Sequence, residues 1–377
     1  QCLGVRERLG PDGRVLVALT DAEIKRLRQQ LQELQVEAVA VCLLHAYANP
    51  AHEEQLAAGL ADLGLPLSLS SQVLPEIREY ERTSTTLINA YIGPVVGKYV
   101  AKLQDRLGEA VLYIQQSNGG FLPASPAPDL AVHTILSGPA GGVNAAWSLG
   151  QQVGQDRLLT FDMGGTSTDV ALINGAIPYS SEYTIDDFPI GIRVIDIHTV
   201  GAGGGSIAWQ DRGGALRVGP QSAGADPGPV CYGSGGTAVT VTDADLWLGR
   251  LLPDFFLGGT MPLHLEACQQ AMARQAAAFA VSPAELALSV IRVANNTMAK
   301  ALRAVSLERG YDPRDFTLVC FGGAGGLHVC DLARELDIRR IIIPAQAGVF
   351  SAQGMATARP HRTLSRTLLL SGDKLTW

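Results

Sequence analysis

The sequence predicts an α/β protein with a largely parallel sheet, because helical and strand patterns alternate along its N-terminal part. Thr20 and Glu23 form a capping box at the start of an amphipathic helix. The apolar run Val39 to Leu44 has the length and composition of a buried strand. A second helix begins at Asn49-Pro50, and Leu65 to Leu69 makes another short strand. Crossover helices between parallel strands produce this alternation.

The composition allows a large core and excludes several classes of function. The chain has 377 residues, of which 47% are hydrophobic and 17% charged, so we expect more than one compact unit and no extensive disorder. A net charge of −7 without a Lys/Arg block excludes the basic footprint of nucleic-acid binding. A phosphate ligand remains compatible, because backbone amides and helix N-termini bind anions without net positive charge.

The sequence also bears on the cellular location of the protein. No apolar run approaches the roughly 18 to 20 residues that span a bilayer, so we expect no membrane segment. Six scattered cysteines without a CxxC pair are typical of reduced thiols, which indicates a cytoplasmic protein. The chain opens abruptly on a polar segment without Met or a signal peptide, and we expect it to be a fragment.

Later segments continue the alternation. A long helical pattern from Arg82 to Leu107 is interrupted at Gly93-Pro94, where we expect a kink or a break. Ser137 to Gly142 opens a further helix, and a helix-rich block runs from Asp243 to Gly310. Buried strands are expected at Leu318 to Phe321 and at Arg339 to Ile343.

The stretch from 158 to 185 predicts an antiparallel meander with a glycine-rich first turn. Leu158 to Asp162 is the first strand, and Thr168 to Ile173 is the second. Asn174-Gly175 is a strong hairpin signal, so Ala176 to Thr184 is expected as the third strand.

The first turn of this meander carries the strongest chemical signal. Asp162 and Asp169 should face each other across the hairpin, and two opposed carboxylates are unfavourable without a cation nearby. Gly164 and Gly165 lack Cβ atoms, so their amides can approach a ligand oxygen, and Thr166 adds a hydroxyl donor. This set suits phosphate oxygens and a hydrated Mg²⁺ ion. The alternative is a glycine hairpin with two solvated aspartates, and the strand context favours the phosphate site.

A second glycine run, Gly322-Gly323-Ala324-Gly325-Gly326, lies between a strand and a helix. It suits a wall for a flat ring or a phosphate, and it equally suits a tight βα turn. The sequence contains neither a Walker A motif nor a GxGxxG fingerprint.

Four other features have open interpretations. Gly201 to Ser206 is either a ligand loop or a packed loop, and Cys231 is a weak candidate nucleophile without a supporting motif. His198 and His328 flank glycine loops, and structural roles are favoured for both. The sequon at Asn295 lies inside a helical pattern, and we discount it.

Several long strings resemble one family along nearly the whole chain. The Gly-Ala-Asp-Pro-Gly-Pro-x-Cys-Tyr-Gly run is the most specific of them. The strings are Val73 to Thr86, Gln116 to Gly120, Ser137 to Gly142, Phe161 to Asp169, Val200 to Ala208, Gly224 to Gly233 and Phe321 to His328. The chain resembles the hydantoinase A/5-oxoprolinase family, in particular its N-methylhydantoinase A and acetone carboxylase β-subunit branch.

The resemblance implies the duplicated actin-like ATPase (ribonuclease H-like) fold. Asp162 to Asp169 would be its second phosphate motif and Gly322 to Gly325 its adenosine-side motif. Similar proteins carry a first phosphate motif upstream of residue 1, so the first phosphate-binding half is incomplete here. The implied domains are 1–72 (remainder of the N-terminal domain), 73–358 (central domain) and 359–377 (start of a truncated C-terminal region).

The resemblance also implies a reaction. Family members use ATP to phosphorylate the oxygen of a cyclic amide or an enolisable ketone, and a hydantoinase B-type partner subunit completes the reaction. Gly164, Gly165 and Thr166 would hold phosphate oxygens, Asp162 and Asp169 would lie near Mg²⁺, and Asp169 is the candidate general base. The full-length form is expected to be oligomeric.

Three functions remain open on the sequence. The first is ATP-dependent hydrolysis of a hydantoin, N-methylhydantoin or 5-oxoproline-like lactam. The second is the ATP-using subunit of an acetone or acetophenone carboxylase. The third is a non-catalytic nucleotide-dependent switch or scaffold.

Overall fold

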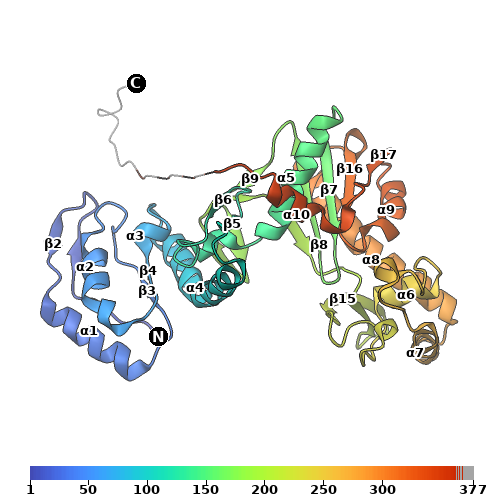
Figure 1. Cartoon of the computed structure of the whole chain (residues 1–377), viewed down its shortest axis with the longest axis horizontal. Helices are drawn as coiled ribbons and strands as arrows, with labels where there is room; N and C mark the ends of the chain where they lie inside the picture. The colour runs from blue at the N-terminus through green and yellow to red at the C-terminus, as the bar shows by residue number, and fades with distance from the viewer. Residues whose placement is uncertain (362, 364, 366, 368–377) are drawn as a thin grey trace. The chain divides into compact units, whose positions relative to one another are not determined.

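The computed structural model describes residues 1–361, 363, 365 and 367, which form two compact units (Figure 1). The first unit comprises Gln1–Ser137, Tyr179–Ile195 and the described residues from Ala358 onward. The second comprises Gly138–Pro178 and Asp196–Thr357. The domain boundaries expected from the sequence stay a prediction, and most of the segment 359–377 lies outside the described residues.

The first unit begins with the predicted alternation of helices and strands. Helix α1 (Asp21–Leu34) starts at Thr20, whose side chain accepts a hydrogen bond from the Glu23 amide. The Glu23 carboxylate accepts from the Arg6 amide and from Arg26, so it does not complete a capping box. Strand β3 (Val39–Val41) pairs in parallel with β4 (Leu67–Leu69), and α2 (Ala51–Leu60) lies between them in the sequence. The α/β alternation is confirmed and this pair is parallel, but the prediction of a largely parallel sheet is wrong, because the other strand pairs described in the first unit are antiparallel.

Helix α4 (Glu79–Leu107) runs without interruption through Pro94, so the expected break is wrong. Hydrogen bonds on the buried side of α4 fix the helix in place just before Pro94. The fully buried Asn89 side chain donates to Ser68 Oγ and to the Asp129 carbonyl, and it accepts from the Val132 amide. Tertiary contacts of this kind override the local preference against proline in a helix.

Short elements complete the first unit. They are β1 (Arg8–Leu9) with β2 (Val15–Val17), α3 (Ser70–Val73), β5 (Tyr113–Gln115) with β6 (Phe121–Pro123), β9 (Tyr179–Ser180) with β12 (Val194–Ile195), and β10 (Tyr183–Ile185) with β11 (Phe188–Ile190).

A five-stranded mixed sheet organises the second unit. Its spatial order is β13 (His198–Val200), β8 (Thr168–Asn174), β7 (Arg157–Met163), β16 (Thr317–Phe321) and β17 (Arg340–Ile342). The first three strands are antiparallel, and β16 is parallel to both β7 and β17. An antiparallel trio followed by parallel strands is the sheet arrangement of an actin-like, ribonuclease H-like half, which confirms the predicted fold class.

The third strand of the meander differs from the prediction. Residues 176–184 do not pair with β8; instead β13 does, with His198 opposite Val170. Gly175 takes the left-handed conformation expected of the turn, with φ +72°. Its amide, however, donates to the Asp156 carbonyl at the start of β7. The turn therefore closes against β7, and Pro178, which has no N–H to donate, suits the departure of the chain from the sheet.

Helices cover both faces of this sheet. On one face, α8 (Pro283–Val305) starts at a Ser282/Glu285 capping box, and its apolar side packs on β7 and β8 together with α6 (Val241–Trp247) and α7 (Leu265–Ala278). The hairpin β14 (Ser206–Gln210) and β15 (Leu216–Ser222) and helix α9 (Val329–Glu335) complete this side. The other face carries α5 (Ser137–Gln152) and α10 (Phe350–Ala356).

Within the described residues, no single helix is long and apolar enough to cross a membrane. The pair Leu265–Ala278 and Pro283–Arg309, bent by 87°, meets the length and composition requirement only when its members are joined.

Candidate functional site

The glycine turn between β7 and β8 has the predicted register. Asp162 is the direct cross-strand partner of Asp169, and Met163 is that of Thr168. Because the side chains of a cross-strand pair lie on the same face of the sheet, the two carboxylates share one side. Phe161 and Met163, which alternate with Asp162, lie in the core on the opposite face.

Burial and mutual repulsion make this carboxylate pair costly. Burial, together with the nearby Asp169, raises the pKa of Asp162 to about 6, and the Ser351 hydroxyl, 3.2 Å from Oδ2, opposes the rise. Burial also raises the pKa of Asp169, against the effect of a hydrogen bond from Thr199 Oγ1. A cation between or beside the two groups would remove this cost, so the pair fits a divalent ion. No group of three or more potential metal ligands occurs among the described residues.

The turn itself is open on one side. A Cβ atom added to Gly164 or Gly165 would meet no other atom within 4 Å, and Gly165 and Thr166 are exposed. The Gly164 amide donates to the Ser167 carbonyl inside the turn, at 3.1 Å. The structure therefore leaves the amides of Gly165 and Thr166, rather than that of Gly164, without a partner among the described residues.

The loop Gly201 to Ser206 packs directly against the other side of the turn. The amides of Gly204 and Gly205 donate to the carbonyls of Gly164 and Gly165, at 3.0 and 2.6 Å. A Cβ on Gly203 would lie 2.7 Å from the Gly165 carbonyl carbon and 2.7 Å from the Thr166 nitrogen. Close contact with the backbone of the turn therefore requires glycine at 203 and 205, and at 204 a Cβ would lie 2.7 Å from Thr242 Oγ1. This glycine run was the signal that could have placed the loop at the site.

The second glycine run also reaches the turn. Strand β16 is parallel to β7 with Phe321 opposite Asp162, and the chain then bends at Gly322 with φ +84°. A Cβ on Gly322 would clash with Asp162 Oδ1, and the Ala324 amide donates to the Met163 carbonyl at 2.9 Å. Gly323 faces open space, and Gly325 is buried against Cys320 and Phe161. The structure thus brings Gly322, Gly323 and Ala324 beside the carboxylate pair.

Sequence reasoning missed Ser351 and left Thr199 without a specific role. Ser351 lies on α10, which can approach α5 closely because a Cβ on Gly141 would be only 2.6 Å from the Ser351 carbonyl. The glycines of Ser137 to Gly142 thereby allow α10 to deliver its hydroxyl to Asp162. Thr199 lies on β13 directly opposite Asp169, and the different course of the third strand concealed that pairing.

The remaining candidates have structural surroundings. Cys231 is fully buried, and burial together with Asp243 moves the pKa of its thiol well above the usual range, which excludes an activated nucleophile. His328 is also fully buried, with Nδ1 2.8 Å from Asn295 Oδ1. Asn295 is 7% exposed, so its side-chain amide makes its contact with His328 inside the protein. His198 is exposed on β13.

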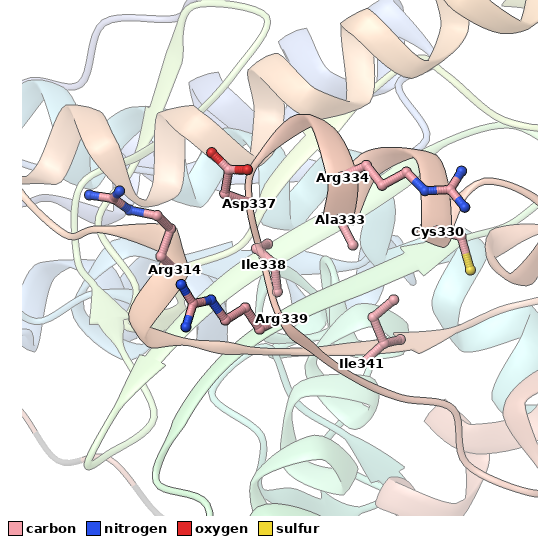
Figure 2. Close-up of a pocket in the computed structure, with 8 residues that line it drawn as sticks. All are labelled: Arg314, Cys330, Ala333, Arg334, Asp337, Ile338, Arg339 and Ile341. Atoms are coloured by element: carbon pink, nitrogen blue, oxygen red, sulfur yellow. The ribbon is translucent and has the colours of Figure 1, made fainter.

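A cavity of about 680 Å³ is lined by a different set of residues (Figure 2). It lies at edge strand β17 and α9 and contains Arg314, Arg334 and Arg339. The guanidinium of Arg314 is paired with Asp312 at 2.6 Å, and that of Arg334 is 3.4 Å from Asp331. These arginines are exposed and partly neutralised, so the glycine turn remains the better candidate for a phosphate ligand.

Comparison with known proteins identifies the family of the chain. The sequence matches the model of the hydantoinase/oxoprolinase family over residues 82–363 and that of the hydantoinase/oxoprolinase N-terminal region over residues 1–64. It is 41% identical over 357 residues to the caprolactamase subunit alpha of Pseudomonas jessenii, covering 92% of this chain and 51% of that one. It is 36% identical over 370 residues to 5-oxoprolinase 1 of Arabidopsis thaliana, covering 93% of this chain and 29% of the relative.

The structure agrees with the sequence matches. A nucleotide-free acetone carboxylase, from a study of ATP-dependent acetone carboxylation, superimposes with a TM-score of 0.85 and 30% identity, covering 94% of this chain and 52% of the other. The chain thus spans about half the length of the caprolactamase and acetone carboxylase chains that it matches, and less of the oxoprolinase. A family match over most of the chain, together with these relatives, establishes that the chain belongs to the hydantoinase/oxoprolinase family.

Proposed function

We propose that this chain is part of an ATP-dependent enzyme that opens a cyclic amide, and that its turn from Asp162 to Asp169 holds the phosphates of ATP. The observation that carries the proposal is the carboxylate pair at the base of an open glycine turn. Two half-buried, mutually repelling carboxylates beside free backbone amides have no structural benefit on their own. They are suited to a magnesium-bound phosphate chain.

Each residue has a distinct part in this proposal. The amides of Gly165 and Thr166 and the Thr166 hydroxyl would donate to phosphate oxygens. Asp162 and Asp169 would bind Mg²⁺, directly or through its water molecules, and the ion would neutralise phosphate charge. Gly323 and Ala324 would line the nucleoside side. Gly322 and Gly164 serve by their backbone conformation, because Gly322 must approach Asp162 and the Gly164 amide closes the turn.

The chemistry needs positioning and charge neutralisation more than covalent catalysis by the protein. The carbonyl oxygen of the cyclic amide would attack the γ-phosphorus of ATP, while the bond to the bridging oxygen breaks and ADP leaves. Asp169 is the candidate base for the amide proton lost in this step. Water would then attack the activated carbon, and ring opening and phosphate release give an amino acid, ADP and phosphate. The names of the caprolactamase and oxoprolinase relatives support a lactam as substrate.

A second candidate is the ATP-using subunit of a ketone carboxylase. The superposition on acetone carboxylase, with its TM-score of 0.85, favours it specifically. In that reaction the enol oxygen of the ketone would take the γ-phosphoryl group of ATP as ADP leaves. The enol carbon would then form a bond to CO₂ derived from bicarbonate, while water takes the phosphoryl group as phosphate and the ketone carbonyl re-forms. In both cases we propose a hydantoinase B-type partner subunit, which the name "subunit alpha" of the caprolactamase supports.

The test is release of ADP by the full-length protein, with and without its partner subunit. Caprolactam, 5-oxoproline and N-methylhydantoin would be offered without bicarbonate, and acetone and acetophenone with it. Lactam-stimulated ADP release without bicarbonate supports the first proposal, and bicarbonate-dependent release with ketones supports the second. ATP-dependent partner binding without any turnover would overturn both and leave a nucleotide-dependent switch.

A further inference from the structure

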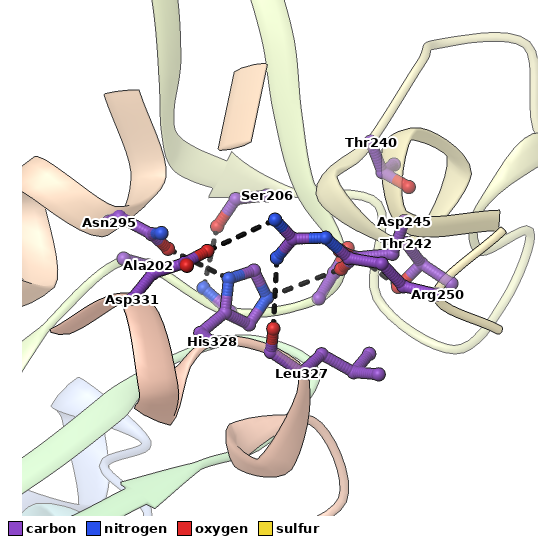
Figure 3. Close-up of polar contacts among 12 residues, drawn as sticks. Ala202, Ser206, Thr240, Thr242, Asp245, Arg250, Asn295, Leu327, His328 and Asp331 are labelled. Atoms are coloured by element: carbon purple, nitrogen blue, oxygen red, sulfur yellow. Dashed lines mark hydrogen bonds and ion pairs between the residues drawn. The ribbon is translucent and has the colours of Figure 1, made fainter. Parts of the chain in front are cut away.

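Helix α6 carries polar side chains that contact the loops around the candidate site. Figure 3 draws two of them, Thr242 and Asp245, together with Ala202, Ser206, Leu327 and His328. The helix has only seven residues, Val241–Trp247, and its first two turns are almost completely buried. Buried polar side chains are costly unless they are paired, so their partners indicate what the helix holds in place. Three side chains of this helix contact three different loops.

Thr242 holds the loop Gly201 to Ser206. Its amide and its hydroxyl both donate to the Gly204 carbonyl, at 2.7 and 2.8 Å. The Gly204 amide in turn donates to the Gly164 carbonyl. Two hydrogen bonds therefore link α6 through Gly204 to the glycine turn from Asp162 to Asp169, which we call the phosphate turn.

Asp243 holds the rigid Asp226 to Tyr232 segment. Its fully buried carboxylate closes the capping box with Thr240 and also accepts from the amides of Val230 and Cys231, at 3.2 and 2.8 Å. This side chain therefore gives the end of the Gly-Ala-Asp-Pro-Gly-Pro-x-Cys string a structural contact through its backbone.

Asp245 contacts the end of the second glycine run. Its carboxylate is 1% exposed and lies 3.2 Å from Nε2 of His328, which is two residues after Gly326 and opens α9. The contact lacks hydrogen-bond geometry, and Asp245 Oδ1 and His328 Nε2 have no hydrogen-bond partner among the described residues. The other ring nitrogen of His328 contacts Asn295 on α8. Arg250, just after α6, donates to the Leu327 carbonyl at 2.9 Å and to Asp331 at 3.0 Å, and its Nε is 3.8 Å from Asp245. Figure 3 shows the side chains of Asp245, Arg250 and Asp331 around the His328 ring.

We propose that Thr242, Asp245 and His328 are positioning residues, and that α6 sets the spacing of the two glycine loops on either side of the phosphate turn. Thr242 controls the loop at Gly204, and Asp245 with His328 controls the loop at Gly322 to Leu327. Because both contacts come from one turn of one helix, a shift of α6 displaces both loops together. The link to ATP use rests on the proposed function, whereas the link between α6 and the loops does not.

Hydrogen–deuterium exchange on the full-length protein without nucleotide tests the link between α6 and the two glycine loops. The amides of Ala324 and His328 are bonded to Met163 and Gly325, and those of Gly204 and Gly205 to the phosphate turn, so both loops have protected amides to follow. Asp245→Asn is expected to increase exchange in peptides covering 322–328 and to leave 201–206 less affected. Thr242→Val is expected to do the reverse.

The matched controls are Asp254→Asn and Thr260→Val, which make the same chemical changes at exposed positions of the same unit. Neither control should alter exchange in either loop. Equal exchange in wild type and both α6 variants would overturn the inference, and so would a uniform rise across the whole second unit, which indicates only general destabilisation.

ATP titration then separates the inference from the proposed function. For Asp245→Asn we expect the KM for ATP to rise about tenfold or more, in line with the loss of a charged buried contact, with a smaller change in kcat. His328→Gln, which keeps a side-chain donor, should recover part of the loss seen with His328→Ala. A wild type that does not bind ATP would sink the proposed function but leave the exchange result intact. An unchanged KM in an Asp245→Asn variant with altered exchange would sink the positioning role alone.

Discussion

Asp162 and Asp169 are direct cross-strand partners whose carboxylates share one side of a hairpin, and a glycine turn open to solvent lies directly above them. Burial raises the pKa of both groups, and that of Asp162 reaches about 6. The folded protein therefore maintains an unfavourable arrangement beside an exposed stretch of backbone. This unfavourable arrangement is the physical basis for the proposal that the pair binds a cation.

Asp162→Asn should abolish magnesium-dependent binding of ATP while leaving the fold intact. The amide is isosteric and can still accept from Ser351, but it provides no charge for the ion. Calorimetric titration of Mg-ATP into the full-length protein should show at least a tenfold loss of affinity. Asp156→Asn, in the turn before β7, is a matched control and should bind like wild type. Equal affinities of Asp162→Asn and wild type would remove Asp162 from the site.

The same pair predicts how stability depends on pH without metal. The folded-state pKa of Asp162, about 6, is above the ordinary value of 3.8, so the folded state binds the proton more tightly than the unfolded state does. Its contribution to the free energy of unfolding is therefore greatest below about pH 4 and is lost as pH rises through 6. Melting temperatures measured in EDTA should show this fall in wild type and a smaller one in Asp162→Asn. Adding Mg²⁺ above pH 6 should restore stability only in wild type, and identical pH profiles of the two proteins would contradict the assignment.

The sequence predicted local features better than long-range ones. The register of Asp162 against Asp169 followed from strand periodicity and a glycine turn, both of which act over a few residues. The predicted third strand was wrong because the Asn174-Gly175 pair indicates a turn but not where the chain goes after it. The course of the chain depends on the hydrogen bond from the Gly175 amide to the Asp156 carbonyl. Ser351 could not be found from the sequence, since its contact with Asp162 depends on how closely α10 packs on α5.

Gly203→Ala should damage the site through the backbone alone. The new methyl group would lie 2.7 Å from backbone atoms of Gly165 and Thr166, which cannot rotate away as a side chain would. We expect a loss of about 1–3 kcal/mol in the free energy of unfolding, together with a large loss of ATP turnover. Gly348→Ala is the control, because a Cβ there meets nothing within 4 Å, and its stability should change by less than about 0.5 kcal/mol. Denaturant unfolding of both variants provides the measurement, and equal stabilities would show that the loop does not press on the turn.

Cys231 offers a test that separates the family string from catalysis. Its sulfur is fully buried and its thiol pKa is raised by burial and by Asp243, so the reactive thiolate is scarce at neutral pH. Iodoacetamide should label the exposed Cys2 and Cys330 of the native protein long before Cys231, as mass spectrometry of digested peptides would show. Cys231→Ala should keep its kcat for ATP turnover within a fewfold of wild type while melting at a lower temperature, because it leaves a small cavity beside the Asp243 carboxylate. Rapid labelling of Cys231 with parallel loss of turnover would instead show that this thiol takes part in the reaction. The segment from Asp226 to Tyr232 would then belong to the catalytic site.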